Sequence, residues 1–346
     1  MASIAFPSFA KHYTVSTRHV YNYVHCPASN PVLPTILFLH GFPSSCYDWR
    51  HQIDFFREAG YGVIAPDLLG YGGTSKPMTL KSYRAKQMAA EIIELVNHEG
   101  LGRVHAVGQE RGAMFLGRLA NYFPDRLLSC TFLNTTYAPP ARHFDLGAAN
   151  RQTQQAAGNQ WYGYLEFLAR DDAGIIIDQH PESFSSLWYS QDPVVWFEHN
   201  GPTGALERWL HEDRRAPEAE YINGIERQVH QSILRFHGPP LKWYQALVRN
   251  INEQDEREAR LDPRLLMPVM LVVTSPAQPD LLGYEAQMRW FAPNFILKRV
   301  STQGRWVQLE ARDEVNAILK TFFDSMLLRA DQMYMLQHGA GDRHLQ

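Results

Sequence analysis

The sequence predicts an α/β fold, in which a mostly parallel, doubly wound β-sheet is interrupted by an inserted helical segment. Two observations carry this prediction. In the first part of the chain, short apolar runs typical of buried parallel strands alternate with segments of helical periodicity. From about residue 141 to 258 the strand-like runs stop, and aromatic and acidic helical segments replace them. We therefore predict a core in two parts, 1–140 and 259–330, around a helical cap at 141–258, followed by a flexible tail at 331–346.

Composition limits the possible partners. The 346 residues are 45% apolar with a formal net charge of -3, so the chain has no basic field for nucleic acid or an anionic membrane, and a small-molecule partner is expected. Cys26, Cys46 and Cys130 show no metal or redox spacing, which indicates reduced, buried thiols. With no secretory or membrane-spanning apolar run, we expect a cytoplasmic protein. The histidines are scattered, so no metal and no cofactor is expected, and a homodimer is possible.

The opening third of the chain contains the predicted strands and helices in alternation. An antiparallel strand is expected over residues 19–24 and a buried parallel strand over 35–39, which leads into the loop His40-Gly41-Phe42-Pro43. A loop after a parallel strand is where backbone amides can face a reacting group. The following elements are a helix at 49–58, a strand at 62–65, a glycine-rich loop at 66–75 without phosphate-binding spacing, and a helix at 83–99.

A sharp turn between a strand and a helix is the central feature. A valine-rich run stops at Gly108, and a helical pattern begins just after Gly112. Glycines flanking such a turn allow the residue between them to be raised on a strained bend at a helix N-terminus, as in a nucleophile elbow. The raised residue is Glu110, so we place it at the centre of the functional site.

The remaining elements complete the sheet. We expect strands at 131–133, 268–274 and 295–300, then a loop at 301–306 and a final helix that ends near Leu328.

At this level of detail the chain resembles capped α/β-hydrolases of the epoxide hydrolase type, of the soluble fungal kind. The segments that carry the resemblance are the loop His40–Pro43, Asp67–Gly72, the turn around Glu110, Gly163–Phe167, Pro240–Tyr244 and Gly304–Glu310. The resemblance implies the α/β-hydrolase fold with a helical cap.

The resemblance also implies a set of roles. In that family an elbow aspartate attacks the epoxide carbon and forms an ester, and a histidine oriented by a second aspartate activates water to hydrolyse it. Two cap tyrosines hydrogen-bond the epoxide oxygen, and a backbone amide of the His-Gly-Phe-Pro loop serves the oxyanion site. In this chain Tyr164 and Tyr244 match the tyrosines, and Phe42 matches the oxyanion residue.

The three remaining positions differ from the family pattern. The elbow aspartate corresponds to Glu110, the orienting aspartate falls near Gln278, and the histidine corresponds to Arg305. A guanidinium does not act as a general base near neutral pH, so an ester on Glu110 would have no evident base to cut it. The same resemblance predicts that Glu110 and Arg305 form a buried ion pair.

We therefore predict a non-hydrolytic, cofactor-independent enzyme that isomerises or cyclises a hydrophobic, oxygenated secondary metabolite by a pericyclic or epoxide-opening reaction. A lyase acting by dehydration or retro-aldol cleavage, a non-catalytic small-molecule-binding protein, and an epoxide hydrolase that uses Glu110 are the alternatives. The predicted catalytic residues are Glu110, Tyr164, Tyr244 and Arg305, and the predicted substrate contacts are His40, Phe42, Gln109, Arg111, Gln278 and Trp306.

Overall fold

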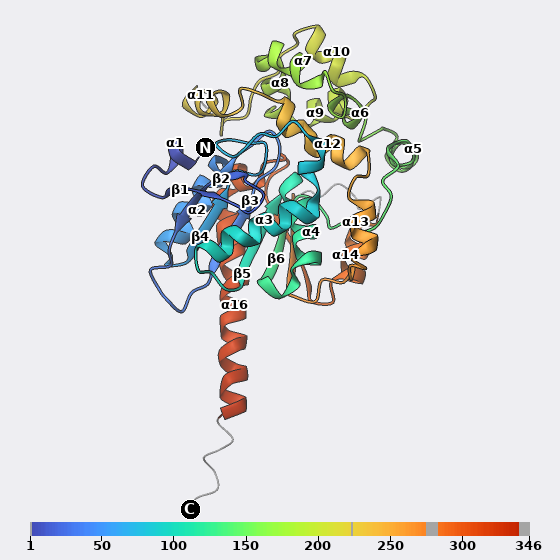
Figure 1. Cartoon of the computed structure of the whole chain (residues 1–346). Helices are drawn as coiled ribbons and strands as arrows, with labels where there is room; N and C mark the ends of the chain where they lie inside the picture. The colour runs from blue at the N-terminus through green and yellow to red at the C-terminus, as the bar shows by residue number, and fades with distance from the viewer. Residues whose placement is uncertain (1, 223, 275–282, 339–346) are drawn as a thin grey trace, which may run out of the picture.

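The computed structural model describes residues 2–222, 224–274 and 283–338 (Figure 1). An eight-stranded sheet forms the centre, with strand order β1-β2-β4-β3-β5-β6-β7-β8. Its strands are β1 (Ala10–Thr14), β2 (Val20–Cys26), β3 (Thr35–Leu39), β4 (Gly62–Pro66), β5 (Val104–Gln109), β6 (Leu127–Leu133), β7 (Val269–Thr274) and β8 (Phe295–Val300).

Strand direction confirms the predicted fold class. β1 pairs with β2 and β2 with β4 in antiparallel register, whereas the strands from β4 through β3 to β8 are all parallel to their neighbours. Every residue of β3, β4 and β5 is buried. This explains their continuous apolar sequences, because helices cover both faces of a parallel sheet.

Alternate strand residues supply two separate cores. Leu37 of β3 packs in the core shared with helices α3 (Ala85–His98) and α4 (Arg111–Tyr122). Its neighbour Phe38 packs in the core on the other face, with α2 (Arg50–Glu58) and α16 (Arg312–His338). Successive side chains of a strand point to opposite faces of the sheet. Helices α3 and α4 therefore pack on one face, and α2 and α16 pack on the other.

The last helix is longer than the sequence led us to expect. α16 continues to His338, so the predicted end near Leu328 is wrong. The chain has no glycine or proline between Arg312 and His338, and helical hydrogen bonds are local, so nothing in this segment interrupts the helix. Its second half extends away from the body of the protein (Figure 1).

Between β6 and β7 the chain is helical. The helices there are α5 (Leu146–Ala157), α6 (Tyr164–Leu168), α7 (Ala173–Gln179), α8 (Pro181–Trp188), α9 (Pro193–Asn200), α10 (Ala205–His211), α11 (Gly224–Ile233), α12 (Gly238–Val248) and α13 (Glu253–Glu258). Most of them form a layer at one end of the sheet, which is the upper layer in Figure 1. The short helices η1 (Cys46–Trp49) and η2 (Leu80–Tyr83) belong to the core, as do η3 (Pro124–Arg126), α1 (Ala2–Ala5), α14 (Tyr284–Phe291) and α15 (Val307–Glu310).

Two further expectations can be compared with the structure. Cys26, Cys46 and Cys130 are buried and unpaired, as predicted. Within the described residues, none of the helices combines the length and the apolar character needed to cross a membrane.

Candidate active site

Glu110 occupies a strained backbone position between β5 and α4. Its φ is 48° and its ψ is -115°, a region that residues other than glycine seldom adopt. A Cβ atom at Gly108 would lie 2.6 Å from the carbonyl oxygen of Gly112, and one at Gly112 would lie 2.1 Å from that of Leu39. Both flanking positions therefore require glycine, and the predicted elbow is confirmed.

The elbow fixes the Glu110 carboxylate in one orientation. Oε2 accepts hydrogen bonds from the backbone N–H of Phe42, at 3.2 Å, and from that of Arg111, at 2.6 Å. Oε1 lies 3.5 Å from the Tyr244 hydroxyl, which donates to it, and 3.3 Å from Nε of Arg111. The side chain is 12% exposed. One carboxylate oxygen is thus held by amides, and the other is turned toward the cap.

Two cap tyrosines stand beside this carboxylate. Tyr164 begins α6 and Tyr244 lies in α12, both are buried, and their ring centroids are 6.3 Å apart. Burial raises the pKa of both hydroxyls. The charge of Glu110 raises them further, and Arg111 acts in the opposite direction. Both phenols consequently remain protonated at neutral pH and can donate a hydrogen bond.

Arg111 balances the charge of Glu110. Its guanidinium lies 4.3 Å from the centroid of the Tyr244 ring. Burial works to lower the pKa of Arg111, but Glu110 outweighs it, so the pKa lies above its ordinary value. Arg111 also lines a cavity of about 120 Å³ together with Met114, Phe115 and Trp243. This cavity adjoins the site through the Arg111 side chain.

Arg305 does not form the predicted ion pair. In the described part of the chain, the ion-pair partner of Glu110 is Arg111, and the Arg305 guanidinium lies 3.7 Å from the centroid of a Trp196 ring. A guanidinium is attracted to an aromatic face, and the Glu110 oxygens already have amide and guanidinium partners. The expectation of a Glu110–Arg305 pair is therefore wrong.

His40, a predicted substrate contact, forms hydrogen bonds with backbone groups through both of its ring nitrogens. Its Nε2 accepts from the Leu68 amide at 2.9 Å, so Nδ1 carries the proton and donates to the Gly41 carbonyl, also at 2.9 Å. Burial lowers its pKa, which keeps the ring neutral. The interpretation of His40 as a substrate contact is therefore wrong, because both nitrogens connect the loop after β3 to the loop after β4.

The other predicted contacts divide between the site and its support. Phe42 contributes its amide to Glu110. Gln109 is 2% exposed and donates to the carbonyl of Arg305 at 3.4 Å, which ties the elbow to the loop after β8. Trp306 is 1% exposed and its indole N–H donates to the carbonyl of Trp188 at 3.2 Å, so this group supports the cap. Gln278 lies outside the described residues.

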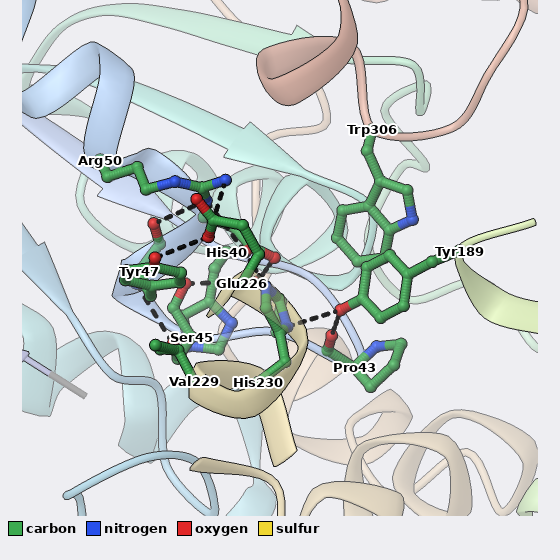
Figure 2. A network of polar contacts seen from close by, with 12 residues as sticks. His40, Pro43, Ser45, Tyr47, Arg50, Tyr189, Glu226, Val229, His230 and Trp306 are labelled. Carbon is green, nitrogen blue, oxygen red and sulfur yellow. Dashed lines mark hydrogen bonds and ion pairs between the residues drawn. The ribbon is translucent and has the colours of Figure 1, made fainter. Parts of the chain in front are cut away.

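A second polar network, which the sequence did not reveal, joins core and cap (Figure 2). Asp48 of η1 is completely buried, and its Oδ1 lies 2.9 Å from Nε2 of His230 in α11. Nδ1 of the same ring lies 3.1 Å from the Tyr189 hydroxyl, which donates to the carbonyl of Pro43. The network therefore ends on the loop whose Phe42 amide binds Glu110.

The hydrogen-bond roles in this network place a proton on Nδ1 of His230. Because the Tyr189 proton goes to a carbonyl, which only accepts, the ring Nδ1 must donate to the Tyr189 oxygen. Burial acts to raise the pKa of Asp48, but His230 and Arg50 outweigh it, so the pKa is lowered and the carboxylate is ionised. Nε2 of His230 faces this carboxylate at 2.9 Å, so the ring joins Asp48 of the core to Tyr189 of the cap.

Comparison with known proteins agrees with this geometry. A family model described as alpha/beta hydrolase fold matches residues 34–311. Epoxide hydrolase A of Mycobacterium tuberculosis is 25% identical over 316 residues, which cover 87% of this chain and 94% of that protein. Epoxide hydrolase srdG of Neurospora crassa is 25% identical over 345 residues, covering 93% and 97%. Bifunctional epoxide hydrolase 2 of Rattus norvegicus is 26% identical over 294 residues, and the match spans 51% of that protein's length.

Solved structures show the same fold. The crystal structure of epoxide hydrolase A from Mycobacterium thermoresistibile superimposes with a TM-score of 0.73 at 24% identity, covering 92% of this chain and 98% of that one. An epoxide hydrolase from an endophytic Streptomyces gives a TM-score of 0.75 at 21% identity, covering 92% and 96%. Since the family model covers most of the chain and the elbow stands where the fold requires it, the protein belongs to the α/β-hydrolase fold family and is an epoxide hydrolase-like member of it.

Proposed function

We propose that this protein is a non-hydrolytic, cofactor-independent enzyme that isomerises or cyclises a hydrophobic, oxygenated small molecule. The observation that carries the proposal is the Glu110 carboxylate, which two backbone amides hold by one oxygen while the other faces the Tyr244 hydroxyl at 3.5 Å. A fixed carboxylate beside a phenol is a base next to an acid. Together they can remove a proton from carbon while stabilising the negative charge that develops on a substrate oxygen.

The surroundings of Glu110 support a reaction without hydrolysis. No histidine in the described ranges forms a hydrogen bond or ion pair with Glu110, and the ring nitrogens of His40 are both occupied by backbone groups. The family resemblance aligns Arg305 with the histidine that activates water, and a guanidinium does not serve as that base. An isomerisation or ring closure needs no water and leaves no ester to be cleaved.

The first experiment tests proton abstraction directly. The protein is incubated with a panel of β,γ-unsaturated and cyclic ketones in D2O, and deuterium uptake and double-bond migration are followed by NMR and ultraviolet absorbance. Glu110→Gln keeps the size of the side chain but removes the base, so we expect a loss of at least about a hundredfold. Glu58→Gln, at an exposed position on α2, is the matched control and is expected to retain full activity.

The cap tyrosines give a second measurement in the same assay. Tyr244→Phe removes the hydroxyl that donates to Glu110 and is expected to lower the rate by about ten- to several-hundredfold. Tyr164→Phe should fall within the same range, and the double variant should be non-additive if both phenols donate to one oxygen. Wild-type rates in the double variant would remove the tyrosines from the mechanism.

Epoxides and esters supply the opposing test. Styrene-oxide-like epoxides and nitrophenyl esters are expected to remain unconverted, with no adduct on Glu110 by intact-protein mass spectrometry. Rapid epoxide hydrolysis that disappears in Glu110→Ala would overturn the non-hydrolytic proposal.

A further inference from the structure

Arg305 carries an enclosed N–H group for which the described residues provide no acceptor. Its Nη1 is fully buried and has no hydrogen-bond partner. The guanidinium lies 3.7 Å from the centroid of the Trp196 ring and 5.8 Å from that of Trp188. Buried polar groups in folded proteins are nearly always hydrogen-bonded, so this unpartnered donor requires an explanation.

The neighbouring carboxylates are already engaged. Glu110 is held by two amides and by Arg111. Glu310, which lies close to Arg305 in sequence, accepts from the Thr302 hydroxyl at 2.5 Å and from the Trp306 amide at 3.1 Å. The site therefore combines one negative side chain, Glu110, with two positive ones, and the charge of Arg305 has no counterpart among the described residues. Arg305 as a residue is partly exposed, but its enclosed Nη1 has lost its hydrogen bonds to water without gaining others, which costs free energy.

We propose that Arg305 binds the carboxylate of the substrate, and that the substrate is an apolar ring system bearing a carboxylic acid. The inference rests on the proposed function, because it assigns the substrate class of the same site. A guanidinium is planar and matches a carboxylate with two parallel hydrogen bonds. The faces of Trp188, Trp196 and Tyr164 supply the apolar wall that a ring system needs, since these three side chains are buried and contact one another.

Arg111 is the rival anchor, and its contacts make it the weaker one. Its Nε lies 3.3 Å from Glu110, so its charge already has a counterpart, and its guanidinium covers the Tyr244 ring. A substrate carboxylate at Arg111 would compete with Glu110 for the same cation. A substrate carboxylate at Arg305 would instead provide the missing partner of the guanidinium. Glu110 and Tyr244 would then remain available to contact the rest of the substrate. Such anchoring away from the reacting atoms is how binding energy orients a substrate.

Stability without ligand gives the first test. Arg305→Met removes the unpaired charge and keeps an apolar, flexible side chain against Trp196. We expect a melting temperature equal to or higher than that of the wild type, because a buried donor without a hydrogen-bond partner is lost. Arg299→Met, at an exposed position on β8, is the matched control and is expected to leave the melting temperature unchanged. A clear drop for Arg305→Met alone would show that the guanidinium is satisfied in the folded protein and would overturn the proposal.

Binding of small probes gives the decisive test. Benzoate, benzamide and 4-nitrophenolate are titrated into the wild-type protein by calorimetry, with tryptophan fluorescence as a second readout. Benzoate is expected to bind at least tenfold more tightly than its neutral isostere benzamide and more tightly than the phenolate. Arg305→Met should lose this preference, Arg305→Lys should retain part of it, and Arg299→Met should retain all of it. Equal binding of benzoate and benzamide, or tighter binding of the phenolate, would overturn the assignment of a carboxylate.

A variant of the rival residue separates the two anchors. If Arg111→Met abolishes the benzoate preference while Arg305→Met keeps it, the carboxylate binds at Arg111 and the proposal for Arg305 fails. These titrations need no turnover, so their outcome is distinct from that of the deuterium-exchange assay. If benzoate binds through Arg305 but no deuterium exchange is seen, the carboxylate assignment stands and the proposed enzymatic activity fails. If exchange is seen but benzoate shows no preference that depends on Arg305, the enzymatic activity stands and the carboxylate assignment fails.

Discussion

Single residues at the elbow show how backbone geometry and side-chain chemistry depend on each other. Glu110 is held at a positive φ, and the two amides that bind its Oε2 are at its own helix N-terminus and on the loop after β3. The strained position is therefore what brings the carboxylate to those amides. Strain of this kind is typical of functional sites, because the surrounding structure must maintain it.

At the same scale, Gly112 is predicted to be indispensable for folding. A Cβ atom there would meet the backbone carbonyl of Leu39 at 2.1 Å, and a strand carbonyl has no room to move. Gly112→Ala is expected to cost about 3 kcal/mol or more of unfolding free energy, as overpacking does. Gly102→Ala is the matched control, since a Cβ atom there meets nothing within 4 Å, and its change should stay within about 0.5 kcal/mol. Urea denaturation measures both, and equal midpoints for the two variants would contradict the steric argument.

At the scale of elements, α16 is held to the sheet by its first half. Phe323 stacks on His105 of β5 with ring centroids 4.4 Å apart and contacts Phe56 of α2 at 5.7 Å. Leu328, one turn and a half further along, is 63% exposed. Among the side chains of α16 that the structure describes, those that anchor the helix to the sheet lie before Leu328.

Two alanine substitutions on this helix should differ in their effect on the unfolding free energy, because Phe323 is packed against the sheet and Leu328 is exposed. Phe323→Ala is expected to lower the unfolding free energy by about 3–5 kcal/mol, because a buried aromatic ring is removed from a core that cannot collapse around the gap. Leu328→Ala on the same helix should change it by no more than about 0.5 kcal/mol. A comparable loss in Leu328→Ala, measured by chemical denaturation, would show that the extended part of α16 is packed against something.

At the scale of the whole molecule, cap and core are joined close to the site. Trp188 donates to the carbonyl of Phe42 at 3.1 Å, and Tyr189 donates to that of Pro43. The contact between Asp48 and His230 joins η1 to α11 as well. The cap therefore helps to position the loop whose amide binds Glu110, which links domain packing to the geometry of the carboxylate.

Breaking the Asp48–His230 pair should weaken this connection. Asp48→Asn removes the buried anion that faces His230 at 2.9 Å and Arg50 at 3.8 Å, and removing one member of such a buried contact typically costs about 3–5 kcal/mol. Asp54→Asn provides the control, because Asp54 forms an exposed ion pair with Arg57 whose loss should cost at most about 1 kcal/mol. Thermal unfolding of both variants measures the difference. Equal melting temperatures would mean that the Asp48–His230 contact contributes no stability.

The effect of Asp48 should also depend on pH, with a sign that follows from its pKa. The folded protein holds the pKa of Asp48 below its ordinary value, mainly through His230 against the opposing effect of burial. Its contribution to stability is present above the unfolded pKa, about 3.9, and is lost as the pH falls through the lower folded pKa. The stability difference between wild type and Asp48→Asn should therefore shrink as the pH falls below about 4. A difference that grows on acidification would contradict this assignment.

The sequence by itself determined the features that depend on neighbouring residues. The apolar runs of β3, β4 and β5, the glycines on either side of Glu110 and the absence of strand patterns from about residue 141 to 258 each reflect local periodicity or local sterics. The fold class and the elbow followed from them. The end of α16 is the one local feature that was predicted wrongly. No glycine or proline interrupts the helix after Leu328, so it continues to His338.

Only the tertiary structure decided the partners of the charged side chains. The sequence paired Glu110 with Arg305, whereas folding pairs Glu110 with Arg111 and places Arg305 on Trp196. Asp48 and His230 are separated by most of the cap and share no motif, yet the fold brings them to 2.9 Å. The physical reason is that an ion pair or a ring contact is set by atomic distances of a few ångströms, and these depend on how distant segments pack and on which acceptors the backbone has already supplied.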